Sequence, residues 1–537
     1  MSTALTSLTA LTGTAPLLRT TLKHDGRGFG PWIAIISVLS ASSVLVYPFI
    51  FPSMQDRAGL AAGIGANPAI GLIFGPAFDL STADGFNAWR ALALGGFFAA
   101  LGAIFVVTRA TRAQEDSGQA ELLASGVLGR ASRLLTGVAM GLIGSLLIGV
   151  IAGVVTGLCG GGWEASMLLG ATFTATGWMF AAVAAVTAQL GSESRTANSI
   201  AVGTLGVLFL LRGFAYSVDA PEWTIWANPL GWMTETRPAT GNHWWPLWYA
   251  LAFTVVVLAV AFVVQARRDF GQGAIAPRPG PSRGTARSTL QLALRLNRGQ
   301  FTTWAIAFLG LGFVFGYFTT SINTMLGSDS AVAQILAAGA TTNDQLVSAF
   351  LVTVFSLIGI IAAIPGVQIM QKVRTEELED RVEPIMATKV RRTRYYGSNV
   401  LLALLAPTVY LLIAGLLVAT LASTANIGVT FGDAFLQAAV TVPAIWTVVA
   451  VAVAVIGARP QVAIAAWAGV LASFALTLLG PTFKLWDSVM AISPFSHIPN
   501  VTATDADGWG LVWITLVTML FVVIGFVGFR RRDLARS

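Results

Sequence analysis

Two short stretches of the chain repeat one pattern of ionisable side chains that could form ion pairs along a helix. In each stretch an arginine precedes one glutamate by three positions and a second glutamate by nine. The six residues are Arg112, Glu115, Glu121, Arg374, Glu377 and Glu383. Because side chains three apart share a helix face, each stretch predicts a short polar helix that could seat in a groove on a soluble partner. The alternative is that both stretches are solvated loops with capping charges. Because the pattern occurs twice, we favour binding to a soluble partner.

The duplication extends along the whole chain. Arg130 recurs as Arg392, and the triplet Arg-Arg-Asp at 267–269 recurs at 531–533. The other recurring pairs are Trp32 and Trp304, Lys23 and Arg295, Pro229 and Pro494, Trp244 and Trp509, and Trp248 and Trp513. Blocks that recur in the same order indicate two tandem repeats.

Chemistry on nucleotides has no sequence signature here. A P-loop needs a lysine directly after a glycine, because its ammonium group grips the terminal phosphates. The four lysines follow other residues, and they are Lys23, Lys372, Lys389 and Lys484. We also find no soluble stretch long enough for an ATPase domain. The chain is therefore expected to be no enzyme, and to bind no cofactor itself.

Proton-coupled transport would need an ionisable group within the membrane. All 25 acidic residues lie in expected loops, tails or span ends, with Glu164 and Asp433 the closest to a span. The histidines His24, His243 and His497 also lie outside the spans. Energy is therefore expected from elsewhere, although a sodium site built from backbone carbonyls remains an open alternative.

Composition shows which elements must position these charges. The chain has 537 residues, 55% hydrophobic and 11% charged, against about 25% charged in soluble domains. Its uncharged runs are long enough to cross a hydrocarbon layer of about 30 Å as helices, and they lack the alternation of barrel strands. The sequence therefore predicts an all-α polytopic membrane protein. Its twelve expected spans are 31–53, 91–108, 134–158, 166–190, 198–213, 246–265, 302–322, 346–370, 397–423, 434–457, 461–480 and 511–529.

The distribution of Lys and Arg predicts the orientation. With the N-terminus inside, the inner segments hold 27 of the 32 basic residues. Because inner loops of membrane proteins are rich in Lys and Arg, both termini are expected in the cytoplasm, and the protein in the cell membrane. The net charge of +7 is then a topology signal, and no nucleic acid is expected as a partner.

An even number of spans in each repeat makes the two repeats parallel, so we expect two tandem parallel six-helix halves. The first half covers 1–270, a Gly-, Pro- and Arg-rich linker covers 271–287, and the second half covers 288–537. Leucines alternate with basic residues ahead of the first span of each half. This pattern predicts an amphipathic helix on the inner membrane surface. The tryptophans of 214–245 predict an anchoring belt at the outer interface, or alternatively a partly re-entrant lid.

The layout resembles the fused permeases of bacterial ABC exporters, and more narrowly the actinobacterial "exporter of polyketide antibiotics" permeases of the tetronasin type. The two Arg-x-x-Glu-x5-Glu loops, the Pro229 and Pro494 blocks and the Arg-Arg-Asp endings carry this resemblance over essentially the whole chain. It implies a separate ABC ATPase subunit in two copies, which binds ATP and Mg, and efflux of a lipophilic compound. It also implies coupling helices at about 111–124 and 373–386. The loops differ where Gly118 and Leu122 align with Asp380 and Pro384, so equal engagement of both ATPase copies is in doubt.

In related exporters the second and fifth spans of each half face the pathway. By that analogy the candidate pathway residues are aromatic, and they are Phe98, Phe105, Phe350, Phe355, Trp467 and Phe474. Aromatic walls suit a flat or greasy substrate, while the alternative for each residue is contact with lipid or packing between helices. Two other functions were weighed. A proton-coupled transporter of the major facilitator kind would carry a Gly-x-x-x-Asp-Arg-x-Gly-Arg-Arg-like loop after span two, which this chain lacks. A membrane-embedded enzyme would need more acidic residues at the outer face than Asp505 and Asp507.

Overall fold

The structure is a computed structural model whose described residues form helices and connecting turns. The described residues are 11–65, 68–119, 121, 128–218, 220–268, 273–275, 284, 286–320, 343–425, 428–479, 486–503 and 507–533. They fall in two compact units, unit 1 (residues 1–280) and unit 2 (residues 281–537).

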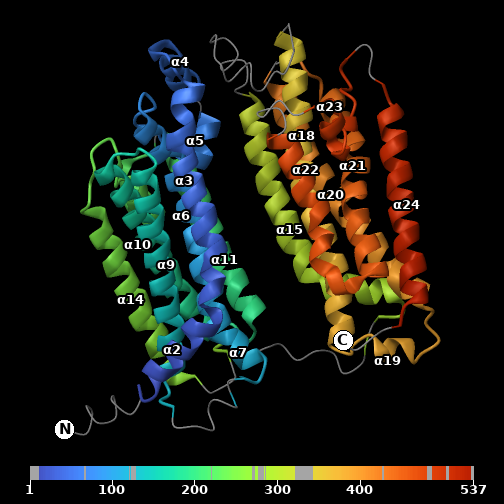
Figure 1. Ribbon diagram of the computed structural model, residues 1–537, viewed down its shortest axis with the longest axis horizontal. Coiled ribbons are helices and arrows are strands. Elements are labelled where there is room, and N and C mark those ends of the chain that lie inside the picture. Colours follow the sequence, from blue (N-terminus) through green and yellow to red (C-terminus); the bar gives the residue numbers. More distant parts are fainter. Residues whose placement is uncertain are drawn as a thin grey trace. The chain divides into compact units, whose positions relative to one another are not determined.

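Unit 1 contains long, roughly parallel helices with shorter helices at their ends (Figure 1). Its described helices are α2 (Thr14–Asp25), η1 (Gly26–Phe29), α3 (Gly30–Ile50), α4 (Met54–Gly65), α5 (Pro68–Phe74), α6 (Ala83–Ala110), α7 (Arg112–Asp116), α9 (Ser132–Leu158), α10 (Trp163–Leu190), α11 (Ser194–Ser217), α12 (Glu222–Trp226), α13 (Pro229–Thr234) and α14 (Pro246–Arg267).

Unit 2 has a similar construction. Its described helices are α15 (Thr289–Thr320), α18 (Asn343–Leu378), α19 (Glu383–Met386), α20 (Arg392–Thr424), α21 (Phe431–Ala458), η2 (Pro460–Trp467), α22 (Ala468–Leu479), α23 (Asp487–Met490), η3 (Pro494–His497) and α24 (Trp509–Arg531).

The described residues contain twelve helices that are long and apolar enough to cross a membrane, and each coincides with one predicted span. The all-α polytopic membrane fold is thereby confirmed. Several helices continue beyond the predicted ends. Helix α18, for example, extends eight residues past the span expected to end at 370. A helix needs only its own backbone hydrogen bonds to continue, so charged residues that mark the end of an apolar run do not end the helix.

Contacts at the helix ends show that the long helices of unit 1 alternate in direction. Arg268, directly after α14, is bonded to Glu115 in α7, directly after α6. At the other end of the unit, the N–H of Gly162 between α9 and α10 donates to Asp84 in the first turn of α6. The ends of α6 and α14 therefore lie together, away from the α9–α10 turn, as a six-span half requires.

Unit 2 shows the same alternation. Arg532, directly after α24, donates to Glu377 in the last turn of α18 and to the carbonyl of Gly457 near the end of α21. Near the beginning of α21, the side chain of Gln437 accepts from the N–H of Val501, which precedes α24. The last turns of three long helices thus meet at one end of unit 2.

The segment ahead of the first predicted span is helix α2, which continues directly through η1 into α3. The carbonyl of Thr12 accepts from the Ser132 hydroxyl at 2.7 Å and from the N–H of Gly129 at 2.9 Å. The predicted amphipathic helix therefore packs against the beginning of α9. In unit 2, residues 289–300 are simply the first turns of α15.

The stretch expected to link the halves contains the boundary between the units. Two of its described residues, Ala274 and Ile275, donate backbone N–H groups to the carbonyls of Gln189 and Leu190, at 2.9 and 3.0 Å. This part of the linker is therefore held against the end of α10.

Candidate functional site

The first charged stretch is turned toward the helix bundle of unit 1. Helix α6 ends at Ala110, and Thr111 leaves the helical conformation with φ −122° and ψ −83° before α7 begins. The hydroxyl of Thr111 donates to the carbonyl of Val107 at 2.6 Å, which holds this turn in place. The change in direction points Arg112 and Glu115 at the ends of the neighbouring helices.

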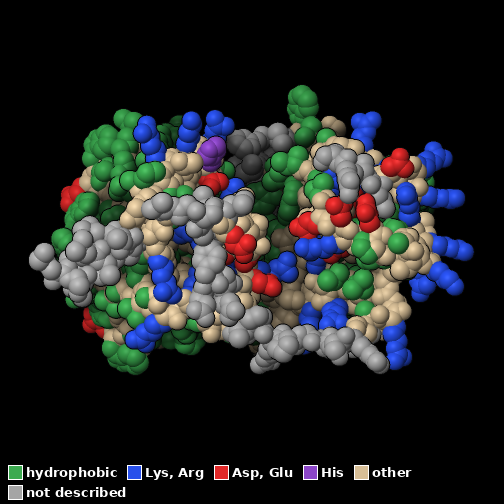
Figure 2. All heavy atoms as spheres, turned by 90° about the horizontal axis from the view of Figure 1, so that it is seen from below, with side chains coloured by type: hydrophobic (Ala, Val, Ile, Leu, Met, Phe, Trp, Pro, Cys, Tyr) green, Lys and Arg blue, Asp and Glu red, His purple; other side chains and the backbone are tan. Residues whose placement is uncertain are grey.

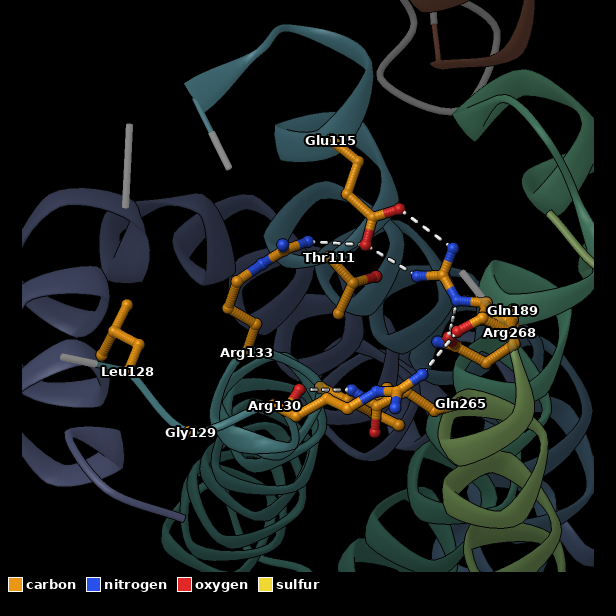
Figure 3. Close-up of a pocket in the computed structure, with 10 residues that line it drawn as sticks. Thr111, Glu115, Leu128, Gly129, Arg130, Arg133, Gln189, Gln265 and Arg268 are labelled. Atoms are coloured by element: carbon orange, nitrogen blue, oxygen red, sulfur yellow. Dashed lines mark hydrogen bonds and ion pairs between the residues drawn. The ribbon is translucent and has the colours of Figure 1, made fainter. Parts of the chain in front are cut away.

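Glu115 is the centre of a buried ion cluster, which we call the unit 1 cluster. Its carboxylate accepts from Arg112 Nη1 at 2.6 Å, from Arg133 Nη2 at 2.6 Å, and from Arg268 Nη2 and Nη1 at 2.7 and 3.1 Å. The Glu115 side chain is 6% exposed and that of Arg112 is 1% exposed. Three guanidinium groups from α7, α9 and the end of α14 therefore converge on one carboxylate, and Figure 3 shows two of them, those of Arg133 and Arg268.

Further hydrogen bonds fix the arginines in this cluster. Arg268 Nε donates to Gln189 Oε1 at 2.6 Å, and the Arg268 carbonyl accepts from Arg130 Nη2 at 2.7 Å. Arg112 Nη2 donates to the carbonyl of Ser192, which follows α10. The unit 1 cluster thus joins the segments that follow α6, α10 and α14 to the beginning of α9.

The second charged stretch builds an equivalent cluster in unit 2. Glu377, with a side chain 2% exposed, accepts from Arg532 Nη2 and pairs with Arg374 Nη1 at 3.5 Å. Arg532 Nε donates to the Gly457 carbonyl at 2.9 Å, and the Arg532 carbonyl accepts from Arg392 Nη1 at 2.8 Å. This unit 2 cluster joins the ends of α18, α21 and α24 to the beginning of α20.

The two clusters share a plan but differ in charge. Arg133 of unit 1 is matched by Tyr395, and Gln114 is matched by Glu376. In unit 2 the Tyr395 hydroxyl donates to Glu376 at 3.0 Å. Unit 2 therefore has one fewer arginine and one more buried carboxylate at the equivalent place.

The structure separates the six residues of the predicted pattern into two sets. Arg112, Glu115, Arg374 and Glu377 lie in the clusters, so their side chains are directed at other helices of the same unit. Glu121 and Glu383 are exposed. The arginine and the glutamate three apart share a helix face as the spacing predicts, and that face is turned into the unit. Whether the two stretches couple to an ATPase stays a prediction.

The partners of Glu115 and Glu377 lie far away in the sequence, and only some residues of each cluster could be recognised from sequence patterns. Glu115 and Arg268 are 153 positions apart, and Glu377 and Arg532 are 155 apart. The repeated Arg-Arg-Asp triplets marked both arginines as notable without showing what they bind. Arg133 had no such signal, since Tyr395 takes its place.

The candidate pathway residues have different surroundings. Phe350 and Phe355 are buried in the core of unit 2, where Phe350 lies 5.4 Å from the Phe318 ring. Both rings pack between helices, and whether they also contact a substrate stays a prediction. Trp467 is half-buried on the same core, and Phe474 is 49% exposed.

In unit 1, Phe98 is half-buried against the core. Phe105 is 40% exposed, and its ring lies 6.2 Å from that of Trp32. Nothing in unit 1 tests whether either ring contacts a substrate, so both stay predictions.

An apolar cavity of about 410 Å³ lies between α9, α10 and α14 of unit 1. Trp178, Trp244 and Trp248 line it together with aliphatic residues such as Leu146 and Met167. The indole N–H of Trp178 donates to the carbonyl of Leu142 at 3.0 Å, which leaves the ring face free for apolar contact. Among the described residues, no three His, Cys, Asp or Glu side chains gather in a way that could hold a metal ion.

The comparisons with known proteins agree with this architecture. The family profile described as "Multidrug efflux system permease Rv1217c, C-terminal domain" matches residues 43–264 and 287–530. The chain is also 35% identical over 547 residues to the multidrug efflux system permease protein Rv1217c of Mycobacterium tuberculosis, a match that covers 97% of this chain and 95% of the relative. The chain belongs to this permease family. Each matched stretch of this efflux-type permease lies within one unit, and contains nearly all of that unit's helices.

Proposed function

We propose that this permease is the membrane-spanning subunit of an ATP-driven exporter of the ABC type. The observation that carries the proposal is the pair of buried clusters, because each one ties a loop to the ends of several spanning helices. A force applied to α7 or to the end of α18 would be passed to those helices through ion pairs rather than through a flexible loop. Such stiff connections suit a protein whose helices are moved from outside the membrane.

The energy for transport would come from a separate ABC ATPase subunit, which would bind ATP and Mg. Two copies of it would be present, one for each unit. In each unit, Lys, Arg, Asp and Glu side chains gather at the end seen in Figure 2, which carries α7 in unit 1 and α19 in unit 2. In unit 2 the exposed residues beside the cluster include Leu378, Glu379, Arg381 and Glu383. We infer that these exposed residues, and Glu121 in unit 1, contact the ATPase, while the buried pairs behind them hold the docking segments in shape.

The relative is named as a multidrug efflux permease, so the exported compound would be a drug, and we propose that it is lipophilic. The apolar cavity beside Trp178, Trp244 and Trp248 has the chemistry to hold such a compound. We place the permease in the cell membrane with both termini in the cytoplasm, on the strength of the Lys and Arg distribution. The finer likeness to exporters of polyketide antibiotics belongs to the same proposal. Membership of the efflux permease family does not favour the major facilitator alternative.

Transport in liposomes tests the energy source. The permease is reconstituted with and without its ATPase, and efflux of a fluorescent lipophilic dye is followed with ATP inside or outside, or with a proton gradient alone. We expect dye movement only with the ATPase and ATP on its side of the membrane. Dye movement on a proton gradient without the ATPase would contradict the proposal.

A further inference from the structure

Helices α9, α10 and α14 pack side by side in unit 1 (Figure 1), and the apolar cavity of about 410 Å³ between them is called the tryptophan cavity below. Ligand pockets in proteins typically enclose about 300–1,000 Å³, so this space can hold a compound of several fused rings. Its lining residues are Leu146, Gly149, Val150, Met167, Ala171, Thr174, Ala175, Trp178, Trp244, Leu247, Trp248 and Leu251. None of these twelve residues is charged, so an ionic ligand would find no counter-charge in the lining.

The polar groups deep in the lining are already bonded within the protein. The hydroxyl of Thr174 lies within hydrogen-bond distance of the carbonyls of Gly170 and Ser145, at 3.2 and 3.3 Å. The indole N–H of Trp178 donates to the carbonyl of Leu142 at 3.0 Å. The cavity therefore offers a ligand ring faces and aliphatic carbon, and recognition has to rest on shape and apolar contact.

The rim of the tryptophan cavity lies along the sides of spanning helices. Leu146 and Val150, in the middle part of α9, are 46% and 44% exposed, and Trp248 in the first turn of α14 is 71% exposed. Exposed apolar side chains in the middle of a spanning helix face the hydrocarbon layer rather than water. A ligand therefore reaches the cavity from within the membrane, where lipophilic compounds accumulate.

The three tryptophans belong to the plan that the two units share. Trp446, Trp509 and Trp513 match them in unit 2, and the Trp446 indole N–H likewise donates to the matched carbonyl, that of Leu404, and also to the hydroxyl of Thr408. At the other nine lining positions, in the order given above, unit 2 has Thr408, Leu411, Leu412, Phe435, Ala439, Val442, Pro443, Val512 and Leu516. Four of these are larger than their counterparts and two are smaller, so unit 1 is distinguished by smaller side chains around the same tryptophans.

Three indole rings favour one kind of occupant over the lipid that surrounds it. An acyl chain that leaves the bilayer for this cavity exchanges one apolar environment for another, and it loses conformational freedom. A flat aromatic compound has little freedom to lose, and it gains ring stacking that hydrocarbon cannot supply. The cavity should therefore prefer rigid aromatic rings to acyl chains.

We propose that the tryptophan cavity binds an uncharged, flat compound of fused aromatic rings that is dissolved in the membrane. This assigns a substrate class and a binding site to the permease, and its place in export rests on the function proposed above. Binding itself needs neither the ATPase nor ATP, because the lining comes from unit 1 alone.

Photolabelling of the whole permease in lipid nanodiscs, without the ATPase, tests the occupant. The first probe is pyrene carrying a diazirine, and the second is phosphatidylcholine carrying a diazirine in its acyl chain. Peptide mass spectrometry locates the residues that each probe labels. We expect the pyrene probe to label α9, α10 and α14 around the cavity, and unlabelled pyrene to suppress that labelling. No such labelling, or labelling by the acyl-chain probe that pyrene does not suppress, would overturn the proposal.

Trp248→Ala and Trp223→Ala form a matched pair, because both side chains are 71% exposed and only Trp248 lines the cavity. Trp248→Ala should lower pyrene-suppressible labelling roughly two- to tenfold, the effect of losing one aromatic contact, and Trp223→Ala should leave it unchanged. If Trp248→Ala does not give a single folded species in gel filtration, Ala171→Phe takes its place, because a ring there fills the cavity from within. Labelling in the folded variant that equals that of the parent protein would contradict the site.

Two further variants separate ring stacking from apolar bulk. Trp248→Phe keeps a ring and should retain more labelling than Trp248→Leu, whereas equal labelling would rule out recognition of flat rings.

Labelling and transport together distinguish this proposal from the proposed function. If the cavity is labelled as expected and liposomes show no ATP-driven efflux, the binding site stands and the exporter does not. If efflux is driven by ATP and the pyrene probe does not label the cavity, the exporter stands and the binding site is wrong.

Discussion

At the scale of single residues, the central fact is that Glu115 and Glu377 each hold a distant arginine at the end of their unit's last helix. Both carboxylates are nearly inaccessible, so their value lies in the helices that they connect rather than in any surface that they present. Burying an ion pair is costly in itself, but removing one partner is costlier still because the other charge remains buried. Each glutamate should therefore respond strongly to neutralisation.

Glu115→Gln is expected to destabilise the permease by about 3–5 kcal/mol, because it leaves three guanidinium groups around a neutral amide. Glu377→Gln should have a smaller effect, since two guanidinium groups pair with Glu377 in the contacts seen, against three with Glu115, and Glu376 remains as a second buried carboxylate in unit 2. Melting temperatures measured in detergent show which of the two variants is less stable. Glu121→Gln, at an exposed position, is the control and should leave the melting temperature unchanged. Equal melting temperatures for Glu115→Gln and Glu121→Gln would contradict the cluster.

Sequence patterns identified these residues but not the long-range contacts that they make. The spacing of Arg112 and Glu115 correctly indicated a pair three apart, and the structure gives that pair a 2.6 Å contact. The same spacing said nothing of Arg268, because pairing across 153 positions depends on how the helices pack. Repetition was the one signal that could have linked them, since both halves repeat the glutamate and the final arginine together.

At the scale of elements, glycine allows neighbouring helices to approach closely. Helices α9 and α10 touch where Gly149 faces Gly170, and a Cβ added to Gly149 would lie 2.2 Å from the Gly170 carbonyl oxygen. In unit 2, a Cβ on Gly457 would lie 2.2 Å from the Gly525 carbonyl oxygen, between α21 and α24. Small residues at helix crossings are typical of membrane proteins, where close packing supplies much of the attraction.

Gly149→Ala should therefore destabilise unit 1, by the roughly 1–3 kcal/mol typical of overpacking, because the added methyl group has to push two helices apart. Gly203→Ala in α11 is the matched control, since nothing lies within 4 Å of a Cβ built there. Alanine should be neutral or slightly favourable at that position because it restricts the unfolded chain more than glycine does. Melting temperatures and the yield of monodisperse protein check both variants, and equal behaviour of the two would count against the crossing.

Elements were the part of the structure that the sequence predicted best. Apolar runs located all twelve long apolar helices found among the described residues, because crossing hydrocarbon demands about 20 apolar residues in a row. Their ends were less predictable. Helix α6 begins at Ala83, well before the apolar run at 91, because Thr82 caps it by accepting from the N–H of Gly85. Such caps and extensions depend on local hydrogen bonds that hydropathy does not report.

At the scale of the whole molecule, one plan is used twice with different details. Each unit ties its second and sixth spans together by a glutamate and an arginine, and each leaves an exposed acidic residue just beyond, at Glu121 or Glu383. Two similar faces suit two copies of one ATPase. The two stretches are not identical, since Asp380 (φ 56°) stands where unit 1 has Gly118 (φ 75°), and Pro384 stands where it has Leu122.

Cross-linking to the ATPase tests this arrangement. The single native cysteine, Cys159, is first replaced by serine, and one cysteine is then introduced by Glu121→Cys or Glu383→Cys. A short bifunctional reagent should join each variant to the ATPase, because both positions are exposed on the face proposed to dock. Yields should differ between the two, since Gly118 and Leu122 of unit 1 are matched by Asp380 and Pro384 in unit 2. Ser81→Cys, exposed at the opposite end of unit 1, is the control and should give no product. A complex that purifies intact yet cross-links at neither Glu121 nor Glu383 would show that the ATPase docks elsewhere, and the buried clusters would then need a role other than transmitting its motion.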